Sequence, residues 1–409
     1  MHCPTKPNCS CQRNWPANPD KQIDKNIAIA IGNFDGIHQG HVKLLETAKL
    51  QAHENNLDFG VVTFDPHPRD FFNSGNSSFK LLDSWEKENL LTQIGVNYLI
   101  IIEFNEELKN CSANDFLSKI LNDTFKVTKM FAGSNFRFGK NREGTIEGNR
   151  SFASKLGLEI IAVDLKQTHS IKGKELEIIS SQKIRKLIQN GQLDIANSLL
   201  GRNWCITGIV EKGKQQGREI GFPTANLNIN NFLKPPLGVY VTRLKIIDHK
   251  ELEISNDWLP SISNIGTRPT VSGDFINLET HVIDLNNEDL DINLYGKRIK
   301  VELLEFLRSE TKFNSLSELK KQIELDTKMA YDFHKLKVYY EDTDSGGVVY
   351  YANYLKFLER ARTEALTSIG YSNKKVKDDF KSLIIVKTCN IEYKKPSYLE
   401  DELSVRSFV

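Results

Sequence analysis

The chain of 409 residues contains 54 basic and 53 acidic residues, which give a formal net charge of +1 at pH 7, and 39% of its residues are hydrophobic. This length predicts two or three domains, and the balanced charge argues against nucleic acid or an anionic membrane surface as the main partner. No apolar stretch approaches the roughly 20 residues that a membrane helix needs, and the N-terminus lacks the apolar core of a signal peptide. We therefore expect a cytoplasmic protein whose partners are small molecules.

Residues 1–24 differ from the rest of the chain. They are rich in Pro, Asn, Lys and Cys and show no periodicity, so we expect a disordered N-terminal extension. A zinc site built from His2, Cys3, Cys9 and Cys11 is the less favoured alternative, because their spacing does not match the usual structural sites.

From residue 25 to about 200, apolar runs alternate with helical patterns, which is typical of a parallel sheet covered by helices. Strands are predicted at residues 27–31, 59–64, 98–102, 129–132 and 158–163. Helices are predicted at residues 42–54, 85–94 and 113–121, the last with Ser112 as its N-cap. The expected fold is a Rossmann-like α/β/α domain, in which ligands bind beyond the carboxyl ends of the strands.

The segment from Gly32 to His41, with the sequence GNFDGIHQGH, joins the first predicted strand to the first predicted helix. His38 and His41 are three residues apart at the start of that helix, so their imidazoles lie on one face. Backbone N–H groups and the positive end of the helix dipole attract phosphate at the same place. The segment therefore predicts a site for a nucleoside triphosphate.

HxGH in this setting resembles the signature of the nucleotidyltransferase superfamily, and the longer pattern GxFDGxHxGH resembles the prokaryotic bifunctional riboflavin kinase/FAD synthetases. The resemblance implies that His38 and His41 are catalytic. It also implies that the residues around them bind ATP, namely Gly32, Asn33, Phe34, Asp35 and Gly40.

Two further segments follow strands of the same predicted sheet. The sequence TFDPHP ends the second strand, and GSNFRFG follows the fourth. The resemblance implies a flavin site made of Asp65, His67, Asn135, Phe136 and Arg137. Asn135 stands where the family commonly has Asp, an exchange that loses a charge but keeps a hydrogen-bonding side chain.

The sequence ISSQKIR at residues 179–185 begins another helix and places Arg185 one turn after Ser181. Two serines before a helix also serve as a simple N-cap, whereas serine hydroxyls with a guanidinium suit a leaving pyrophosphate. Because ISSxxxR follows HxGH in nucleotidyltransferases, the resemblance implies ATP binding by Ser180 and Ser181 and a catalytic role for Arg185.

From residue 204 to about 306 the helical periodicity stops, and short apolar runs alternate with turn signals. The runs lie at residues 204–210, 239–247, 278–283 and 299–306. They predict a small antiparallel β-barrel or sandwich, and the resemblance described next implies the barrel. Ser315 and Glu318 then form a capping box before a helix predicted over residues 319–333.

Residues 208–226, which precede the second of these runs, resemble the riboflavin kinase domain. The PTAN motif of that family, at residues 223–226 here, lies under the ATP phosphates. The resemblance implies ATP binding by Gly213, Gly217, Arg218, Pro223, Thr224 and Asn226. Thr224 and Asn226 offer two oxygens on the same face of an extended segment, which suits Mg²⁺ and a phosphate.

Glu279 matches the general base proposed for the same family. Taken alone, a strand glutamate would be interpreted as a solvated residue. However, the strings at residues 236–240, 264–270, 278–281 and 291–296 all resemble the kinase domain in its order. A carboxylate near the riboflavin 5′-hydroxyl accepts its proton as the γ-phosphoryl group is transferred.

Residues 335–409 carry a different signature. The sequence YYEDTDSGGVVYYANY at residues 339–354 resembles the acyl-CoA thioesterases of the hotdog superfamily, especially the Tol-Pal-associated type, and Asp344 matches their catalytic aspartate. Tyr351 stands where many relatives carry His. After a helix over residues 354–369 come strand runs at 383–393 and 403–409, whereas the family's sheet continues, so we expect a partial hotdog domain. A natural fusion, a truncated product and two joined reading frames stay open as explanations.

The expected organisation is an extension at 1–24, an FMN adenylyltransferase domain at 25–200, a riboflavin kinase domain at 201–334 and a hotdog segment at 335–409. The resemblance implies phosphorylation of riboflavin to FMN and adenylation of FMN to FAD, with ATP as co-substrate and Mg²⁺ as cofactor. Hydrolysis of acyl-CoA by the hotdog segment, with homo-oligomerisation through that segment, is the alternative or an added activity. A non-enzymatic flavin-binding regulator is a third alternative.

Overall fold

The computed structural model of the chain divides it into two compact units, which are described separately. The first contains the residues up to Thr207 together with Ile229–Pro236, and the second contains Gly208–Asn228 and the residues from Leu237 onward. The structure describes residues 10–13, 25–73, 78–164, 166, 178–212, 217, 221–247, 258–270, 273–283, 293–334, 338, 340–344, 346–368, 389, 391–393, 395–401 and 403.

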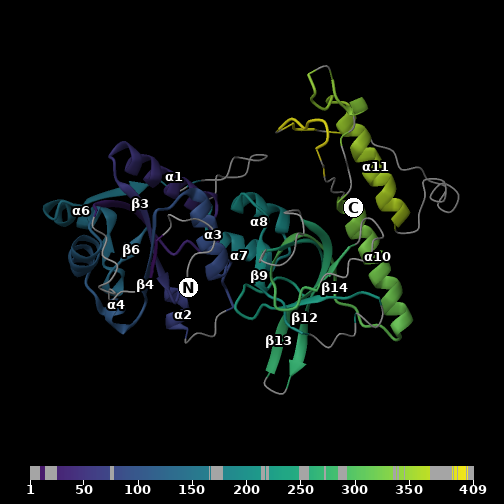
Figure 1. The fold of residues 1–409 in the computed structure, drawn as a ribbon, viewed down its shortest axis with the longest axis horizontal. Helices are drawn as coiled ribbons and strands as arrows, with labels where there is room; N and C mark the ends of the chain where they lie inside the picture. Colours follow the sequence, from purple (N-terminus) through teal and green to yellow (C-terminus); the bar gives the residue numbers. More distant parts are fainter. Residues whose placement is uncertain are drawn as a thin grey trace. The chain divides into compact units, whose positions relative to one another are not determined.

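A six-stranded sheet in the order β1-β4-β3-β2-β5-β8 forms the centre of the first unit (Figure 1), and each neighbouring pair is parallel. Its strands are β1 (Ser10–Arg13), β2 (Ile27–Ile31), β3 (Asp58–Asp65), β4 (Tyr98–Glu103), β5 (Val127–Gly133) and β8 (Glu159–Val163). The chain builds outward from β2 through β3 to β4 and then continues with β5 and β8 on the other side of β2. The order therefore reverses between β2 and β5, where a Rossmann-like sheet binds its ligand. The predicted fold of this unit is confirmed.

Within residues 1–24 the structure describes strand β1, in which Ser10–Arg13 pairs with Tyr98–Ile101 of β4. The edge of β4 offers unpaired backbone N–H and C=O groups, and an added strand satisfies them. Of the proposed zinc ligands, His2, Cys3 and Cys9 lie outside the described residues, and Cys11 is part of β1.

Both faces of this sheet are buried, as the alternation along β2 shows. Ile27, Ile29 and Ile31 belong to one hydrophobic cluster, and Ala28 and Ala30 belong to another. The flanking helices are α1 (Gln39–Glu54), α2 (Pro68–Phe72), α3 (Ser84–Ile94), α4 (Glu106–Asn110), α5 (Ala113–Asp115), α6 (Ile146–Lys155), α7 (Ser181–Gln189) and α8 (Leu193–Leu200). A short ribbon of β6 (Arg137–Phe138) and β7 (Gly144–Thr145) follows β5.

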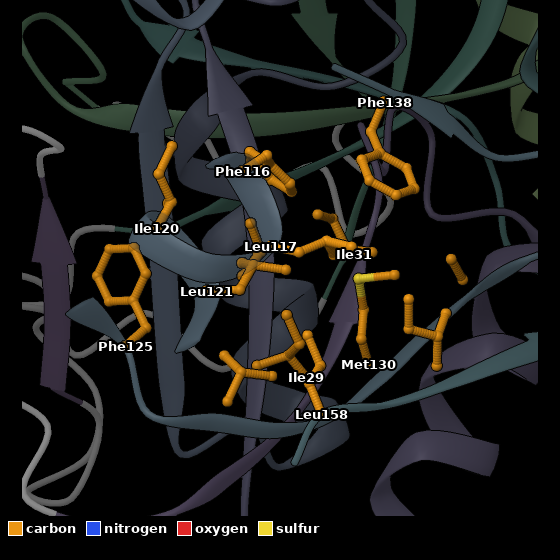
Figure 2. Packing of buried hydrophobic residues seen from close by; sticks show 14 of the residues in the cluster. Ile29, Ile31, Phe116, Leu117, Ile120, Leu121, Phe125, Met130, Phe138 and Leu158 are labelled. Atoms are coloured by element: carbon orange, nitrogen blue, oxygen red, sulfur yellow. The ribbon is translucent and has the colours of Figure 1, made fainter. Parts of the chain in front are cut away.

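The helix predicted over residues 113–121 begins as expected but changes its geometry. Ser112 caps α5, since its hydroxyl accepts a hydrogen bond from the N–H of Asp115. The chain then continues as the π-helix η1 (Phe116–Thr124). Figure 2 shows side chains of η1, among them Leu117, packed in one cluster with Ile31 of β2 and Met130 of β5.

A second six-stranded sheet has the strand order β10-β13-β12-β11-β14-β9. Its strands are β9 (Cys205–Ile209), β10 (Ala225–Asn228), β11 (Gly238–Ile246), β12 (Leu259–Thr270), β13 (Gly273–Val282) and β14 (Arg298–Ser309). The pairs from β10 to β14 are antiparallel, and a bridge between Glu211 and Asn226 links the segment after β9 to β10. The expected barrel is therefore confirmed as a nearly closed sheet. Strand β12 was missed because Pro260 and Pro269 weaken its sequence pattern.

Helix α10 (Leu316–His334) packs against this sheet through the cluster of Val239, Val241, Ile262 and Ala330. The predicted cap is present, since the Ser315 hydroxyl accepts from the N–H of Glu318 at 3.2 Å. A buried ion pair adds a fixed contact: Arg308 of β14 donates through Nε and Nη2 to the Asp326 carboxylate, with the Nη2 distance at 2.6 Å.

The C-terminal segment contains η3 (Tyr340–Asp342) and α11 (Asn353–Ser368). Val338, Val349 and Phe357 form its small buried cluster. The strands expected at 383–393 and 403–409 fall mostly outside the described residues. Across the described part of the chain, no helix combines the length and the apolar character needed to cross a membrane.

Candidate active sites

The two histidines of the HxGH sequence come together at the N-terminus of α1. His38 is the N-cap residue, and its Nδ1 accepts a hydrogen bond from the backbone N–H of His41 at 3.2 Å. The two imidazole rings are stacked, with centroids 3.7 Å apart. The His41 ring also makes an edge-to-face contact with the ring of Phe34, and these two centroids are 5.3 Å apart. Because His38 Nδ1 is an acceptor, the neutral ring carries its proton on Nε2.

Both imidazoles are held in the neutral form. Burial, aided by the charges of Arg202 and Arg185, lowers the pKa of His38 from 6.5 to about 4. Burial also lowers the pKa of His41 well below its usual value, and the neighbouring His38, Lys87 and Arg202 act in the same direction. His41 Nδ1 is buried without a hydrogen-bond partner in the described part of the chain. In the tautomer with its proton on Nδ1, His41 would donate a hydrogen bond from this atom to an oxygen of a ligand.

The loop between β2 and α1 has an unusual backbone. Phe34 and Ile37 have positive φ angles of 47° and 36°, a region that side-chain-bearing residues rarely occupy. Gly40 allows the close packing of the histidine pair, because a Cβ atom there would lie 3.1 Å from the His38 ring and 3.4 Å from the carbonyl of Ile179. The loop is therefore held by its surroundings in a conformation that its own residues do not favour.

Asp35 is the residue that fixes this loop to distant parts of the first unit. Its Oδ1 accepts from the N–H of Leu81 at 2.9 Å, and its Oδ2 pairs with Arg185 Nη2 of α7 at 2.5 Å. The Ser181 hydroxyl donates to the Asp35 carbonyl at 2.8 Å. The structure thus brings ISSxxxR to the HxGH loop, as the sequence predicted. It also shows Asp35, Ser181 and Arg185 engaged with one another.

The residues expected to bind flavin follow the two strands that flank β2. Asp65 and His67 lie at the end of β3, where burial lowers the pKa of His67 to about 4 and its Nδ1 accepts from the N–H of Arg69 at 3.0 Å. On the other side, Asn135 and Arg137 are exposed just after β5. The parallel order places both segments at the same edge of the sheet as the histidine pair.

Two cations near the histidines were not singled out from the sequence. Arg202 donates to the carbonyls of Gly36 and Ile37 at 2.6 and 2.9 Å, and so holds the strained loop. Lys87 of α3 donates to the carbonyl of Asn33 at 3.0 Å. Lys87 is 54 residues from Asn33 and Arg202 is 166 residues from Gly36 in sequence, so no local pattern reveals them, whereas the hydrogen bonds do.

A cavity of about 490 Å³ marks the second candidate site, in the second unit. Thr224, Glu279 and His281 line it from one side of the sheet, and Phe313, Leu319 and Ile323 contribute apolar walls on and before α10. The Arg308–Asp326 pair lines it as well and holds α10 against β14. A largely apolar cavity with a few polar groups on one wall is typical of a small-molecule site.

The strand register places three polar residues in one row across this sheet. Glu279 of β13 is directly opposite Asn226 of β10 on one side and Asn264 of β12 on the other. Directly opposed residues project to the same face of a sheet, so the predicted base and one predicted metal ligand share a face. The structure adds Asn264, which lines the cavity and was not among the predicted site residues.

The sequence around PTAN is held in place by backbone contacts. His281 Nδ1 is 2.9 Å from the carbonyl of Pro223, and burial lowers the pKa of this histidine, so the neutral ring donates to that oxygen. A Cβ atom at Gly217 would lie 2.4 Å from the carbonyl of Phe222, so only glycine fits there. Gly213 and Arg218 lie outside the described residues.

The residues of PTAN also fit a magnesium ion. Asn226 Oδ1 is buried and accepts no hydrogen bond from the described residues, while its Nδ2 donates to the Thr224 carbonyl at 3.3 Å. A carbonyl-type oxygen without a donor is a suitable ligand for Mg²⁺. No group of three His, Cys, Asp or Glu residues in the described part of the chain is arranged to hold a metal, so neutral oxygens and the nucleotide phosphates would have to supply the ligands.

Asp344, the predicted catalytic residue of the C-terminal segment, is exposed and part of a tight turn. Its Oδ1 accepts from the N–H groups of Gly346 and Val348 at 2.8 and 3.3 Å, and its own N–H donates to the carbonyl of Val348 at 2.8 Å. One carboxylate oxygen therefore stabilises the turn.

Three family models match the chain in succession. The model for FAD synthetase matches residues 20–180, that for riboflavin kinase matches residues 200–334, and that for the thioesterase-like superfamily matches residues 338–409. The boundaries agree with the position of the two candidate sites, since the histidine pair falls in the first match and the polar row in the second.

Curated proteins are similar to most of this chain. The chain is 35% identical over 319 residues to the bifunctional riboflavin kinase/FMN adenylyltransferase of Escherichia coli (strain K12), which covers 78% of this chain and 96% of the relative. It is 34% identical over 316 residues to the protein of the same name from Bacillus subtilis (strain 168), covering 76% and 93%. A crystal structure described as a macrolide-efflux protein from Streptococcus pneumoniae superposes with a TM-score of 0.61 at 25% identity, over 78% of this chain and 98% of that one.

The buried state of His38 predicts a pH dependence for the stability of the first unit. The pKa is about 4 in the folded chain and about 6.5 when unfolded. The unfolded state therefore takes up a proton first as the pH falls below 6.5, and stability is lost towards pH 4. Replacing His38→Asn keeps an N-cap acceptor but removes this titration. We expect the loss of unfolding free energy between pH 7 and pH 5 to be smaller by about 2 kcal/mol in the variant.

The unfolding free energy is measured at pH 7 and at pH 5 by urea unfolding, and hydrogen exchange of the β2 amides reports on the first unit. Carboxylates that titrate in the same range affect both proteins equally. An identical pH dependence in the two proteins would mean that His38 is not neutral in the folded state.

Proposed function

The chain belongs to the bifunctional riboflavin kinase/FMN adenylyltransferases, and we propose that it performs the two reactions at two separate sites. Riboflavin is phosphorylated by ATP to FMN at the polar row of the second unit. FMN is adenylated by a second ATP at the histidine pair of the first unit, giving FAD and pyrophosphate. The observation that carries the first-unit assignment is the stacked pair of neutral imidazoles at the N-terminus of α1, directly after the central strand of the sheet.

In the adenylyltransferase site, the chain supplies hydrogen-bond donors to phosphate. The neutral imidazoles of His38 and His41 donate N–H groups to oxygens of the ATP phosphates without adding a charge of their own. The N-terminus of α1 adds backbone N–H groups and its positive dipole. Asp35 acts as a positioning residue, because it ties this loop to α7 through Arg185 and Ser181. The flavin of FMN binds to the segments that contain His67 and Asn135, at the same edge of the sheet.

In the kinase site, Glu279 accepts the proton of the riboflavin 5′-hydroxyl as that oxygen attacks the γ-phosphorus and ADP leaves. Thr224 and Asn226 would hold Mg²⁺, the cofactor of this family, which would supply positive charge to offset that of the ATP phosphates. Asn264 lies on the other side of Glu279, where its amide is placed to orient the base or the ribityl chain. Both reactions are expected in the cytoplasm, the location that the sequence predicts.

Loss of either histidine should separate the two activities. His38→Ala or His41→Ala removes a phosphate donor from the first unit only, so we expect FAD formation to fall on the order of 100-fold or more while FMN accumulates from riboflavin and ATP. Chromatography of the flavins measures both products. His53→Ala, on the exposed last turn of the same helix, is the matched control and should behave like the unaltered protein. An equal decline of FMN production in a folded His41→Ala protein would refute two separate sites.

The converse prediction, loss of riboflavin phosphorylation alone, concerns Glu279→Gln. The amide keeps the size of the side chain but cannot accept the hydroxyl proton, so riboflavin phosphorylation should fall by about 10²- to 10⁴-fold. Added FMN should still be converted to FAD at the normal rate. Glu324→Gln, on an exposed position of α10, controls for the loss of one negative charge. Near-normal kinase turnover in Glu279→Gln would leave this residue a structural role only.

The C-terminal segment is the basis for a second candidate function, acyl-CoA hydrolysis, because it matches the thioesterase-like superfamily. Acyl-CoA as a ligand and self-association through this segment are both part of that candidate. Against it stands the position of Asp344, whose Oδ1 already accepts two backbone N–H groups in an exposed turn. A nucleophile or base in a water-accessible turn has lost the dry, pre-organised setting that such catalysis needs.

We therefore expect no hydrolysis of short- or long-chain acyl-CoA above that of Asp344→Asn, which keeps the turn through its side-chain oxygen. A free-thiol assay on the whole chain measures this, alongside the molecular mass in solution. Turnover that disappears in Asp344→Asn would instead show a working thioesterase, and a dimer in the same sample would indicate that self-association builds it.

A further inference from the structure

We infer that Lys87 is a catalytic residue of adenylyl transfer, binding the FMN phosphate and the α-phosphate of ATP where the two meet. The inference rests on the proposed function of the first unit and deepens it by naming the cation of that site. Lys87 lies on the second turn of α3 and is separated in sequence from both the HxGH loop and the ISSxxxR helix.

Lys87 contacts the loop expected to bind ATP, and it is near enough to the residues expected to bind flavin for its charge to act on them. Its Nζ donates to the carbonyl of Asn33, at the beginning of the HxGH loop. Its charge acts on Asp35 and His41 of the nucleotide set and on Asp65 and His67 of the flavin set. These two sets follow the adjacent strands β2 and β3. The ammonium group is therefore placed at the junction that a phosphate of FMN has to reach in order to attack ATP.

The other cations around this junction already have strong partners. Arg185 is paired with Asp35 and donates to the carbonyl of Phe79 at 2.9 Å. Arg202 donates to two carbonyls of the strained loop, and Lys80 is paired with Asp70 at 3.1 Å. Lys87 forms no ion pair with the described residues, and a single carbonyl accepts from it. Because an ammonium group has three donors, two remain for a ligand.

Burial supports the same interpretation. It lowers the pKa of Lys87, while Asp35 and Asp65 oppose this shift without pairing with the ammonium group. A partly desolvated cation without an anionic partner is costly in a folded chain, and a bound phosphate would compensate it. The histidine pair cannot take this role, since both rings are neutral.

The chemistry of the proposed reaction favours a cation at this place. An oxygen of the FMN phosphate forms a bond to the α-phosphorus of ATP, and the bond from that phosphorus to the bridging oxygen breaks. The electron pair of the broken bond leaves on pyrophosphate. Two anionic groups approach each other in this step, so a fixed positive charge between them lowers the repulsion as the new bond forms. Lys87 keeps its proton throughout.

The test compares Lys87→Met and Lys87→Arg with the unaltered full-length protein. FAD formation is measured with varied FMN and with varied ATP, and the reverse reaction is measured from FAD and pyrophosphate. Lys87→Met should lower kcat/KM for FMN on the order of 100-fold, as the removal of one transition-state contact does. Lys87→Arg should recover at least a tenth of the normal value, because it restores the charge. Riboflavin phosphorylation should be unchanged in both.

Lys49→Met is the matched control. Lys49 also donates to one backbone carbonyl, that of Ile94 at 2.7 Å, but it is exposed on α1 and away from the site. Its loss should leave FAD formation within about twofold. Normal kcat/KM for FMN in Lys87→Met would overturn the inference. An equal loss in Lys87→Met and Lys87→Arg, or a loss together with a lower melting temperature, would also overturn it, because Lys87 would then only hold the Asn33 loop. An unaltered protein that forms no FAD would instead refute the proposed function itself.

Discussion

The buried ion pair between Asp35 and Arg185 is the interaction on which the first unit's site depends. It joins residues 150 positions apart in sequence and, with the Ser181 hydroxyl on the Asp35 carbonyl, fastens the loop after β2 to the start of α7. The loop needs such a tie, because Phe34 and Ile37 occupy positive φ angles that their side chains disfavour. Removing one partner of a buried pair leaves an uncompensated charge and typically destabilises a protein by about 3–5 kcal/mol.

This tie also explains how charge is distributed around the histidine pair. With Arg185 engaged by Asp35, and Arg202 engaged by the carbonyls of Gly36 and Ile37, these guanidinium groups hold the loop and at the same time lower the pKa of His38. In the proposed site the imidazoles would serve as neutral donors, and Lys87 forms no ion pair with a carboxylate among the described residues. The proposed site would thus combine neutral donors with the positive charge of Lys87, while Arg185 and Arg202 hold the loop.

The polar row of the second site follows from strand register. Asn226, Glu279 and Asn264 share a row because β10, β13 and β12 are neighbours with fixed antiparallel pairing. A shift of one residue in any of these strands would turn its member of the row to the other face. The bidentate Arg308–Asp326 contact then holds α10 over the same cavity, so its apolar residues form the wall opposite the polar row.

The sequence by itself determined the fold class of both units and the capped helices at Ser112 and Ser315, because these depend on local patterns of hydrophobicity and capping residues. The roles expected for the HxGH and PTAN segments and for the proposed base Glu279 came from the resemblance of short strings to a known family. The sequence did not reveal Lys87, Arg202 or Asn264, strand β12, or the pairing of Ser10–Arg13 with β4. Nor did it show that Asp35 and Arg185 bind each other or that both histidines are neutral. Only the tertiary structure decided these points, because contacts between distant segments, burial of ionisable groups and strand order arise when the chain packs, and no short stretch of residues encodes them.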